Sequence, residues 1–416
     1  MDVSLQQVFV EHFEAYASGH RLHPREQRAA WCISQCHRPA LGAHVLECPA
    51  GHGSILQSHA CRHRSCPRCA EPARQQWLGR ELQRLLPCEH FHVVFTLPHE
   101  FLALWQLNRI WFAQTLFDCA RSSLLTLCAE PRLLGAMPGL LMALHTWGRN
   151  LSRHPHLHCL LSAGGLDAQG QWRSTRAGWA LPLKPLQQLF RGRLLSSLKQ
   201  ALLAQRLRLP PQQACPAVWH QAIARQWRKH WNIQINPAYP HGRGVALYLA
   251  RYVCGGPLGG NRRLHSSPAG IGFAYLDHRD GKHKRMHLSH SEFIARVLWH
   301  APPKGQHTVR RAGLYASAHL SQHRIAQALL RPALPQSLSP ITATHAAIVS
   351  PPSSPCPRPP PSCAVCSAPL TRRLLPPQAI AHHFGENSIS RPATVVQPGP
   401  TGSSTGHPRA SPAAAG

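Results

Sequence analysis

The chain contains 416 residues, of which 45 are Lys or Arg and only 16 are Asp or Glu, so its formal net charge is +29 with neutral histidines. Such an excess of basic residues is typical of proteins that bind phosphate-rich partners, although a solvated basic surface or a coding bias towards Arg would produce the same excess. No run of about 18 apolar residues occurs, which excludes a transmembrane helix. The first 20 residues carry acids and no basic segment, so we expect no signal peptide and a cytoplasmic location.

The first part of the chain carries a helix and then a segment without a core. Apolar residues recur at helical spacing over residues 4–20, which predicts an amphipathic helix. Residues 32–69 are rich in Cys and His and poor in long apolar runs. A segment of that composition cannot bury a core of its own, so we expect a metal ion to organise it.

The Cys/His segment predicts a structural zinc site. In a reducing compartment the 15 cysteines of the chain are expected to be metal ligands or buried thiols and not disulfides. Cys66 and Cys69 have the sharpest spacing, because a two-residue gap lets both sulfurs bind one tetrahedral ion. The segment holds enough ligands for one closed site and leaves some for a second, and spacing does not assign ligands to ions. The candidates are Cys32, Cys36, His44, Cys48, His52, Cys61, His63, Cys66 and Cys69.

Strands and helices are predicted in the middle of the chain. β-Branched and aromatic runs predict buried strands, and longer apolar stretches at helical spacing predict helices. The hairpin 273–289 is expected to turn at Asp280-Gly281, and the last helix to open at Ser291. The predicted strands cover residues 91–98, 139–147 and 156–165, and the predicted helices cover residues 102–128, 183–206, 245–253 and 291–300.

From about residue 331 onwards the sequence is dominated by Pro, Ser and Ala. Segments of this composition cannot bury enough apolar surface to fold, so we expect a disordered tail.

A second candidate metal site lies on the strand 156–165. His156 and His158 are two residues apart, so their side chains point to the same face of a strand. Two imidazoles leave positions on a divalent ion open for phosphate oxygens and water. The spacing alone is weak support, because a chain with 31 histidines contains such triplets by chance, and His90-Phe-His92 is another.

A pair of tyrosines occurs on the predicted helix 245–253. Tyr248 and Tyr252 are four residues apart, which places them on one helical face about 5–6 Å apart. A phenol oxygen can attack a phosphodiester and hold DNA covalently, and Arg251 between them could meet the phosphate backbone. The alternative is a pair of core aromatics on an amphipathic helix.

These motifs occur together in one order. The Cys/His block is followed by HFHVVFTLPHEF, LHTWGRNLSRHPHLHCLLSAGGL, YLARYVCGGPLGGNRRL and EFIARVLWHAPPKGQHTVRRAGLYA. In this order the chain resembles the rolling-circle HUH transposases of the insertion-sequence family numbered ninety-one, over roughly residues 25–320. The HPHLHC and YLARY blocks are the most specific parts of the resemblance.

The resemblance implies an α+β protein with three parts. These are an N-terminal helix and zinc-binding module (1–80), a catalytic domain built on a ferredoxin-like antiparallel sheet (85–325), and the disordered tail (331–416). It implies an enzyme that nicks and rejoins single-stranded DNA at insertion-sequence ends through a 5′-phosphotyrosine, with Mg²⁺ or Mn²⁺ at the active site and Zn²⁺ in the module.

The resemblance also implies residue roles. His156 and His158 match the catalytic metal pair, and Tyr248 and Tyr252 match the nucleophiles. The third ligand of that metal stays open, with His145 on the adjacent strand as one candidate. The zinc ligands are matched by Cys36, His44, Cys48, Cys61, Cys66 and Cys69.

The sequence departs from the family pattern at several positions. Ser65 stands where His is common, and Cys48 is followed by His52 where a second Cys is usual, so His63 or His52 is expected to substitute in the zinc set. Arg149 replaces a more usual Gln. The late cysteine pair of the family corresponds to Cys363 and Cys366, which stand in the Pro-rich tail without clear partners.

Two other classes of protein fit the sequence less well. A transposase with an acidic triad needs three carboxylates around two metal ions, and acids are scarce here. A zinc-dependent basic protein that binds DNA without cutting it, or a decayed transposase copy, would share the charge and the Cys/His block. Formation of a covalent adduct with single-stranded DNA distinguishes these classes from the enzyme.

Overall fold

The computed structural model describes residues 1–175, 181–239, 249–250, 256–258, 262–277, 280–331, 361–376 and 395–396. By its contacts the chain divides into two compact units, which alternate along the sequence. Unit 1 comprises Met1–Ser34 and Arg62–Pro340, and unit 2 comprises Gln35–Cys61 and Ile341–Gly416. The division therefore differs from the sequential domains expected from the sequence.

The centre of unit 1 is a six-stranded antiparallel sheet with the strand order β12-β5-β6-β4-β8, in which β7 also pairs with β6. Its long central strands are rich in Leu, Val and Phe, as expected for strands buried on both faces. The strands are β4 (His90–Thr96), β5 (Met137–Trp147), β6 (Arg153–Leu166), β7 (Trp172–Ser174), β8 (Ile233–Tyr239) and β12 (Val309–Gly313).

Helices separate these strands in a regular way. The long helices α5 and α6 follow β4 and β6, so that a β-α-β-β-α-β path runs through four strands in the spatial order β8-β4-β6-β5. The strands predicted at 91–98, 139–147 and 156–165 correspond to β4, β5 and β6. The helices on this path and beside it are α4 (Leu102–Leu107), α5 (Arg109–Ala129), α6 (Leu183–Leu203) and α7 (Pro216–Trp227).

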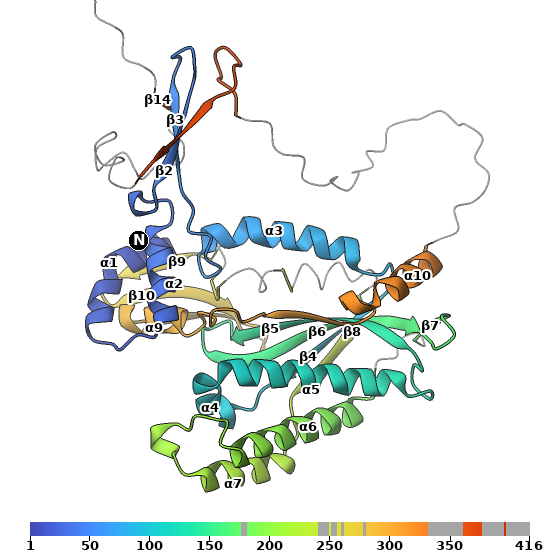
Figure 1. The fold of residues 1–416 in the computed structure, drawn as a ribbon. Coiled ribbons are helices and arrows are strands. Elements are labelled where there is room, and N and C mark those ends of the chain that lie inside the picture. The colour runs from blue at the N-terminus through green and yellow to red at the C-terminus, as the bar shows by residue number, and fades with distance from the viewer. Residues whose placement is uncertain are drawn as a thin grey trace, which may run out of the picture. The chain divides into compact units, whose positions relative to one another are not determined.

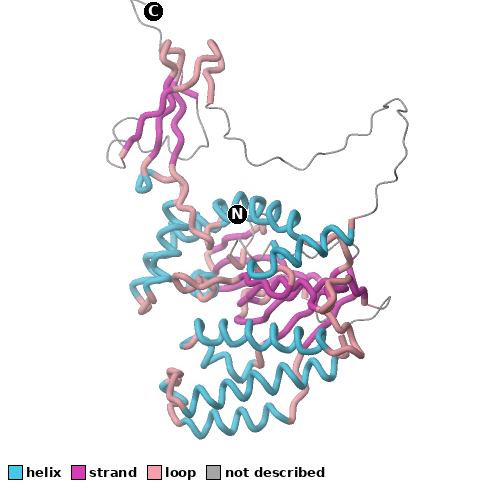
Figure 2. Tube along the Cα trace, turned by 45° about the vertical axis from the view of Figure 1, so that its right-hand side comes forward, coloured by secondary structure: helices cyan, strands magenta, loops and turns pink. Residues whose placement is uncertain are grey.

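Alternation along the strands gives the sheet two different faces. On one face, residues such as Met142, Leu144 and Leu157 form the main core with α4, α5, α6 and α7. On the other face, Ala143 and Leu160 form a smaller core with α3 (Pro67–Arg84) and α10 (Leu320–Leu330). The helical layers on the two sides are visible in Figure 1, and Figure 2 shows them from a second direction.

A second sheet of unit 1 has the order β1-β9-β10-β11. The hairpin predicted at 273–289 is β10 and β11, with Gly281 at a positive φ of 67° in the turn. Helix α9 begins at His290, and its N-cap is Ser289 and not the expected Ser291, since the Ser289 hydroxyl accepts the backbone N–H of Glu292. The remaining elements are β1 (Asp2–Val3), α1 (Leu5–Ser18), α2 (Pro24–Gln35), β9 (Leu264–Ser267), β10 (Gly270–Leu276), β11 (His283–Leu288) and α9 (His290–Leu298).

Unit 2 contains a four-stranded sheet with the order β13-β2-β3-β14. Strand β13 belongs to the region that the composition predicted to be disordered, yet it pairs with β2 over its whole length, from Thr371 opposite Glu47 to Leu375 opposite Ala43. The apolar core of this sheet is very small and consists of Ala43, Val45 and Leu375 with Leu56 against it. The strands are β2 (Ala43–Glu47), β3 (Ser54–Ser58), β13 (Thr371–Leu375) and β14 (Val395–Val396).

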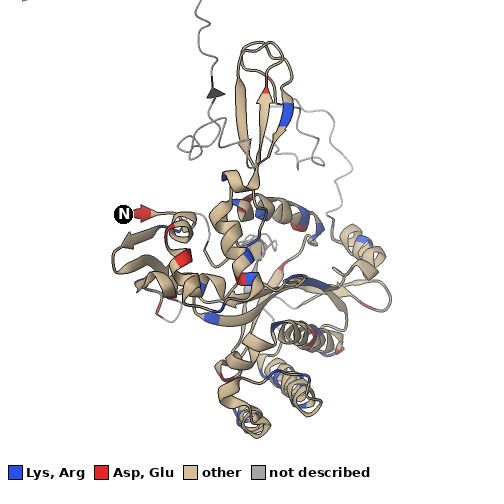
Figure 3. Cartoon of the chain, turned by 60° about the vertical axis from the view of Figure 1, so that its left-hand side comes forward, with Lys and Arg blue, Asp and Glu red and all other residues tan. Residues whose placement is uncertain are grey.

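Short 3-10 helices connect several elements, namely η1 (Pro39–Leu41), η2 (His99–Phe101), η3 (Pro211–Gln213) and η4 (Ser317–His319). Among the described residues, no helix combines the length and the apolar character that crossing a membrane would require. Lys and Arg are spread over helices and strands and are not confined to one element (Figure 3).

Candidate functional site

Three histidines meet on the face of the central sheet that carries the smaller core. His156 and His158 lie on β6, and His145 lies directly opposite His156 on β5. One ring nitrogen of each lies within 4.8 Å of the other two, and the centroids of the His145 and His158 rings are 4.1 Å apart. The paired spacing of two residues places His156 and His158 side by side, as the sequence predicted. We refer to His145, His156 and His158 as the histidine cluster.

Hydrogen bonds fix two of these rings. His156 Nδ1 lies 2.6 Å from the carbonyl oxygen of His154, to which a protonated Nδ1 donates. His158 Nδ1 lies 2.8 Å from Nε2 of His92 on β4, and His92 Nδ1 lies 3.0 Å from Nδ2 of Asn236 on β8. The cluster thus rests on contacts that reach across three neighbouring strands.

His92 was missed as a site residue, because its triplet His90-Phe-His92 looked like chance. The signal that could have identified it is the predicted strand 91–98. If that strand pairs with 156–165, His92 falls on the same face as His158 by the two-residue period. The structure has this pairing, with Val94 opposite His158.

Burial keeps His145 and His158 neutral. It lowers the pKa values of His145 and His158 well below the ordinary value, with a further contribution from the neighbouring histidines. Burial also lowers the pKa of His92 to about 4. Neutral imidazole is the form that binds a metal ion. Three protein ligands leave coordination positions open, which suits a catalytic ion better than a closed structural one.

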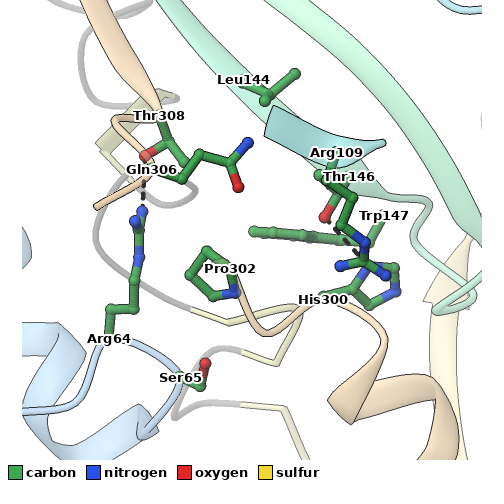
Figure 4. A pocket seen from close by; sticks show the side chains of 10 residues that line it. All are labelled: Arg64, Ser65, Arg109, Leu144, Thr146, Trp147, His300, Pro302, Gln306 and Thr308. Atoms are coloured by element: carbon green, nitrogen blue, oxygen red, sulfur yellow. Dashed lines mark hydrogen bonds between the residues drawn. The ribbon is translucent and has the colours of Figure 1, made fainter. Parts of the chain in front are cut away.

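A small pocket lies at the end of β5 beside the cluster. It is lined by ten residues, which come from the segment before α3, the start of α5, the end of β5 and the segment 300–308 (Figure 4). The ring of Trp147 reaches into it and stacks at 5.9 Å on His145. The lining residues are Arg64, Ser65, Arg109, Leu144, Thr146, Trp147, His300, Pro302, Gln306 and Thr308.

Arginines surround this end of the strands. Arg109 is only 8% exposed, and burial together with the nearby charge of Arg25 lowers its pKa to about 9. It therefore stays charged at neutral pH. Arg153, at the start of β6, lies with its guanidinium carbon 3.7 Å from the centre of the Trp299 ring. Arg64 donates to the Thr308 hydroxyl at 2.7 Å. The positive charge suits a phosphate-bearing ligand.

The tyrosine pair and Arg251 cannot be placed in the same way. Tyr248, Arg251 and Tyr252 lie outside the described residues. Their neighbours Leu249 and Ala250 are helical and fully buried, and they belong to the smaller core with Ala143 and Leu160.

In the segment that follows, the structure also places Gly256. A Cβ at Gly256 would lie 3.3 Å from the carbonyl oxygen of Ser65, which lines the pocket. Leu249 and Ala250 are thus on the side of the sheet that carries the histidine cluster, and Gly256 lies near the pocket.

The predicted zinc ligands fall in both units. In unit 1, Cys66 is the N-cap of α3 and its Sγ lies within 4.8 Å of that of Cys69 in the first turn. In unit 2, the Sγ atoms of Cys36 and Cys61 lie within 4.8 Å of each other. Cys48 follows β2, and its Sγ is 3.5 Å from Nδ1 of His52.

His44 stands apart from these cysteines. Its Nδ1 lies 2.6 Å from Nε2 of His59 and 3.1 Å from a guanidinium nitrogen of Arg372. Among the described residues it joins none of the three groups of ligand side chains whose atoms lie within 4.8 Å of one another.

Two family models match the chain. One, described as "Transposase zinc-binding domain", matches residues 8–97. The other, described as "Putative transposase", matches residues 139–323, which include β5, β6 and the histidine cluster. No solved structure matches the chain.

Two curated relatives are similar over most of the described sequence. "Putative transposase y4qJ" from Sinorhizobium fredii (strain NBRC 101917 / NGR234) is 34% identical over 322 residues, which is 76% of this chain and 81% of the relative. "Transposase for insertion sequence element IS801" from Pseudomonas savastanoi pv. phaseolicola is 34% identical over 272 residues, which is 64% of this chain and 63% of that protein. The extent of these matches, together with the zinc-binding module at the N-terminal side, identifies the chain as a member of the insertion-sequence transposases of the family numbered ninety-one.

Proposed function

We propose that this chain nicks and rejoins single-stranded DNA at the ends of an insertion sequence, in the cytoplasm, through a covalent 5′-phosphotyrosine in rolling-circle transposition. The observation that carries the proposal is the position of the histidine cluster. It lies on the same sheet face against which Leu249 and Ala250 pack, and these two residues stand between Tyr248 and Tyr252 in the sequence.

The strand order supports this function through the fold. Four strands in a β-α-β-β-α-β path with the order β8-β4-β6-β5 agree with the proposed ferredoxin-like sheet. In such a sheet β6 is central and is held on both sides, so the two histidines that it carries have little freedom. Function is still argued from the site and not from the fold, since one fold serves many activities.

The residues fit a divalent ion such as Mg²⁺ or Mn²⁺. His156 and His158 would hold it through Nε2 and His145 would complete the set, and the ion would polarise the scissile phosphate. If His158 binds the ion through Nε2, its Nδ1 carries the proton and donates a hydrogen bond to Nε2 of His92. His92 in turn donates from Nδ1, so the amide of Asn236 would present its oxygen there, half a turn from its present orientation.

The chemical step belongs to the tyrosines. The phenol oxygen of one tyrosine bonds to the phosphorus, the bond from phosphorus to the 3′ oxygen breaks, and the 3′ oxygen gains the proton that the phenol loses. The second tyrosine can take the other strand in the same way, so that strands exchange without hydrolysis. Arg251 is proposed to contact the phosphate backbone beside them. We assign the first attack to Tyr248, because Tyr252 is nearer the Gly255-Gly256 end of the predicted helix.

The zinc-binding module is proposed to use the two cysteine pairs described above. Each pair supplies two thiolates, and thiolates are ligands that structural zinc prefers.

A covalent adduct with DNA tests the proposal. Labelled single-stranded DNA carrying an insertion-sequence end is incubated with protein and Mn²⁺, and a band that survives SDS is measured. Y248F/Y252F should bind the DNA and form no adduct, because the attacking oxygens are gone while the rings remain. Y275F on β10 is the matched control and should form the adduct normally. Binding by wild type with no adduct would favour a non-catalytic DNA-binding protein, and a phosphotyrosine mapped to Tyr275 or Tyr315 would overturn the assignment.

A further inference from the structure

A second group of metal-ligand side chains lies entirely within unit 2. Cys48 and His52 come from the turn between β2 and β3, and Cys363 and Cys366 come from the segment before β13. Their ligand atoms all lie within 4.8 Å of one another. We refer to these four residues as the split cluster, because more than 300 positions separate its two halves, with 311 between His52 and Cys363.

Strand pairing explains how the halves meet. Glu47, the last residue of β2, lies opposite Thr371, the first residue of β13, in an antiparallel register. Cys48 directly follows Glu47, and the Cys363–Cys366 turn directly precedes β13. Both halves are therefore brought to the same end of the sheet by backbone hydrogen bonds.

Hydrogen bonds from backbone N–H groups define the shape of the β2–β3 turn and of the Cys363–Cys366 turn around their cysteines. The backbone N–H of Cys48 donates to Gly53, and the N–H of Gly51 donates back to Cys48, which closes the β2–β3 turn. In the other turn, the N–H of Val365 donates to Sγ of Cys363 at 3.4 Å. Ser367 adopts a positive φ of 58° where the turn ends.

The distances match one tetrahedral zinc ion. Bonds of about 2.3 Å to sulfur and about 2.0–2.1 Å to nitrogen place two sulfurs about 3.8 Å apart, and a sulfur and a nitrogen about 3.6 Å apart. Cys48 Sγ lies 3.5 Å from Cys366 Sγ, and His52 Nδ1 lies 3.5 Å from Cys48 Sγ and 3.9 Å from Cys363 Sγ. A disulfide needs sulfurs about 2.05 Å apart, so the separation of Cys48 and Cys366 does not correspond to one.

We propose that Cys48, His52, Cys363 and Cys366 form a three-cysteine, one-histidine structural zinc site that fastens the C-terminal segment to the β2–β3 hairpin. The match to the zinc-binding family model ends at residue 97 and so contains only half of this ligand set. Among the residues of unit 2 that the structure describes, the apolar core is too small to hold the sheet by burial alone. Metal binding therefore supplies the free energy that keeps β13 in place.

Zinc stoichiometry of the full chain tests the site directly. Wild type and the single variant C215S, which changes an exposed cysteine, should carry the same amount of zinc. C363S/C366S should carry one equivalent less, because two of the four ligands are removed. The same zinc content in all three proteins, or a Cys363–Cys366 disulfide found by mass spectrometry without reduction, would overturn the proposal.

A histidine series separates ligand loss from misfolding. H52A should lose the same equivalent of zinc, whereas H52C should keep it, because a fourth thiolate replaces the imidazole. With Co²⁺ in place of zinc, H52C should gain sulfur-to-metal charge-transfer absorption in the near ultraviolet relative to wild type. Equal zinc in H52A and wild type would remove His52 from the site. Adduct formation by wild type is measured separately, so failure of this site and failure of the proposed tyrosine chemistry are distinguishable.

Discussion

His92 is a positioning residue in the site as we interpret it. It does not belong to the histidine cluster, but its Nε2 lies 2.8 Å from Nδ1 of His158. A second ring nitrogen held in this way fixes both the orientation and the tautomer of a metal-binding histidine.

We predict that H92A weakens metal binding and leaves the chemistry intact once metal is bound. Loss of such an outer partner typically costs about 10–100-fold in metal affinity. The Mn²⁺ concentration that gives half-maximal adduct formation should rise by this factor, and saturating Mn²⁺ should restore the rate.

H230A is the control, since His230 is exposed and is not one of the residues to which His92 is hydrogen-bonded, and it should leave the Mn²⁺ dependence unchanged. An H92A protein with the wild-type Mn²⁺ dependence would contradict the positioning role, as would a loss of rate that excess Mn²⁺ does not restore.

Replacing the cluster itself should have a different effect. H156A and H158A should bind single-stranded DNA with nearly the wild-type affinity, because contacts of Lys and Arg with the phosphates dominate affinity. Adduct formation should fall strongly, since the remaining imidazoles cannot keep the ion in place. Gel-shift and adduct assays on the same preparations check this, and full activity of the double variant would remove both residues from the mechanism.

A buried histidine near the pocket gives a pH dependence of stability. Burial lowers the pKa of His300 to about 3, whereas the unfolded value is about 6.5. Below pH 6.5 the unfolded chain therefore binds a proton that the folded chain does not, and stability falls on acidification. Between pH 6.5 and pH 5 this amounts to about 2 kcal/mol.

The loss is measured as the shift of the urea midpoint between pH 7 and pH 5. H300Q removes the titrating group, so its midpoint should shift less than that of wild type over the same range. An equal shift in both proteins would show that His300 does not contribute.

At the scale of residues, the sequence predicted which side chains share a strand face better than it predicted which residues of other strands they contact. The period of two along a strand was enough to place His156 and His158 together. The contacts of His92 and of the Cys363–Cys366 turn depend on which strands pair, and no local pattern carries that information.

At the scale of elements, the end of the β5–β6 hairpin combines an aromatic ring with arginines. Trp147 lines the pocket there. Trp172 lies on β7 opposite Leu166, which is ten residues along β6 from His156. At about 3.3 Å per residue, that is roughly 30 Å away. Its ring covers Gly164, where a Cβ would come within 2.5 Å of it.

We predict that, of Trp147 and Trp172, only Trp147 binds unpaired bases. Stacking contributes about 1–3 kcal/mol per base, so W147A should weaken binding to single-stranded DNA by about 5- to 150-fold, as measured by fluorescence anisotropy. W172A is the matched control and should change the affinity little, although it removes packing on Gly164. Equal losses in both variants would argue against stacking at the pocket.

Most elements with strong periodicity were predicted well, and those that depend on distant pairing were not. The central strands and α6 follow their apolar patterns closely. Strand β13 lacks such a pattern, with one buried residue among five. It forms a strand because its backbone pairs with the edge of β2. The N-cap of α9 was misplaced by two residues, because Ser289 and Ser291 are equally good caps by composition and only the turn after β11 decides between them.

At the scale of the whole molecule, the charge of +29 predicts steep salt dependence. Each phosphate neutralised on a single strand contributes a slope of about −0.7 to log K against log salt concentration. We expect R251A to reduce the slope by about that amount. R132A, in the loop before β5 at the other end from His145, should not.

Titrations between about 50 and 200 mM salt, on single-stranded and on blunt duplex DNA, check both expectations. A flat dependence, or equal affinity for the two forms of DNA, would contradict a binding surface built for single strands.

The pairing of β2 with β13 has a consequence for the order of synthesis. The hydroxyl of Thr371 donates to the carbonyl oxygen of Glu47 across 324 positions. At about 5–20 residues per second, a ribosome needs roughly 15–65 s to make the chain between them. For that time the edge of β2 that faces β13 has no neighbour, and an open strand edge invites pairing with other chains. We therefore expect a nascent chain that stops before residue 371 to depend on a chaperone, or on DNA already bound, to stay soluble.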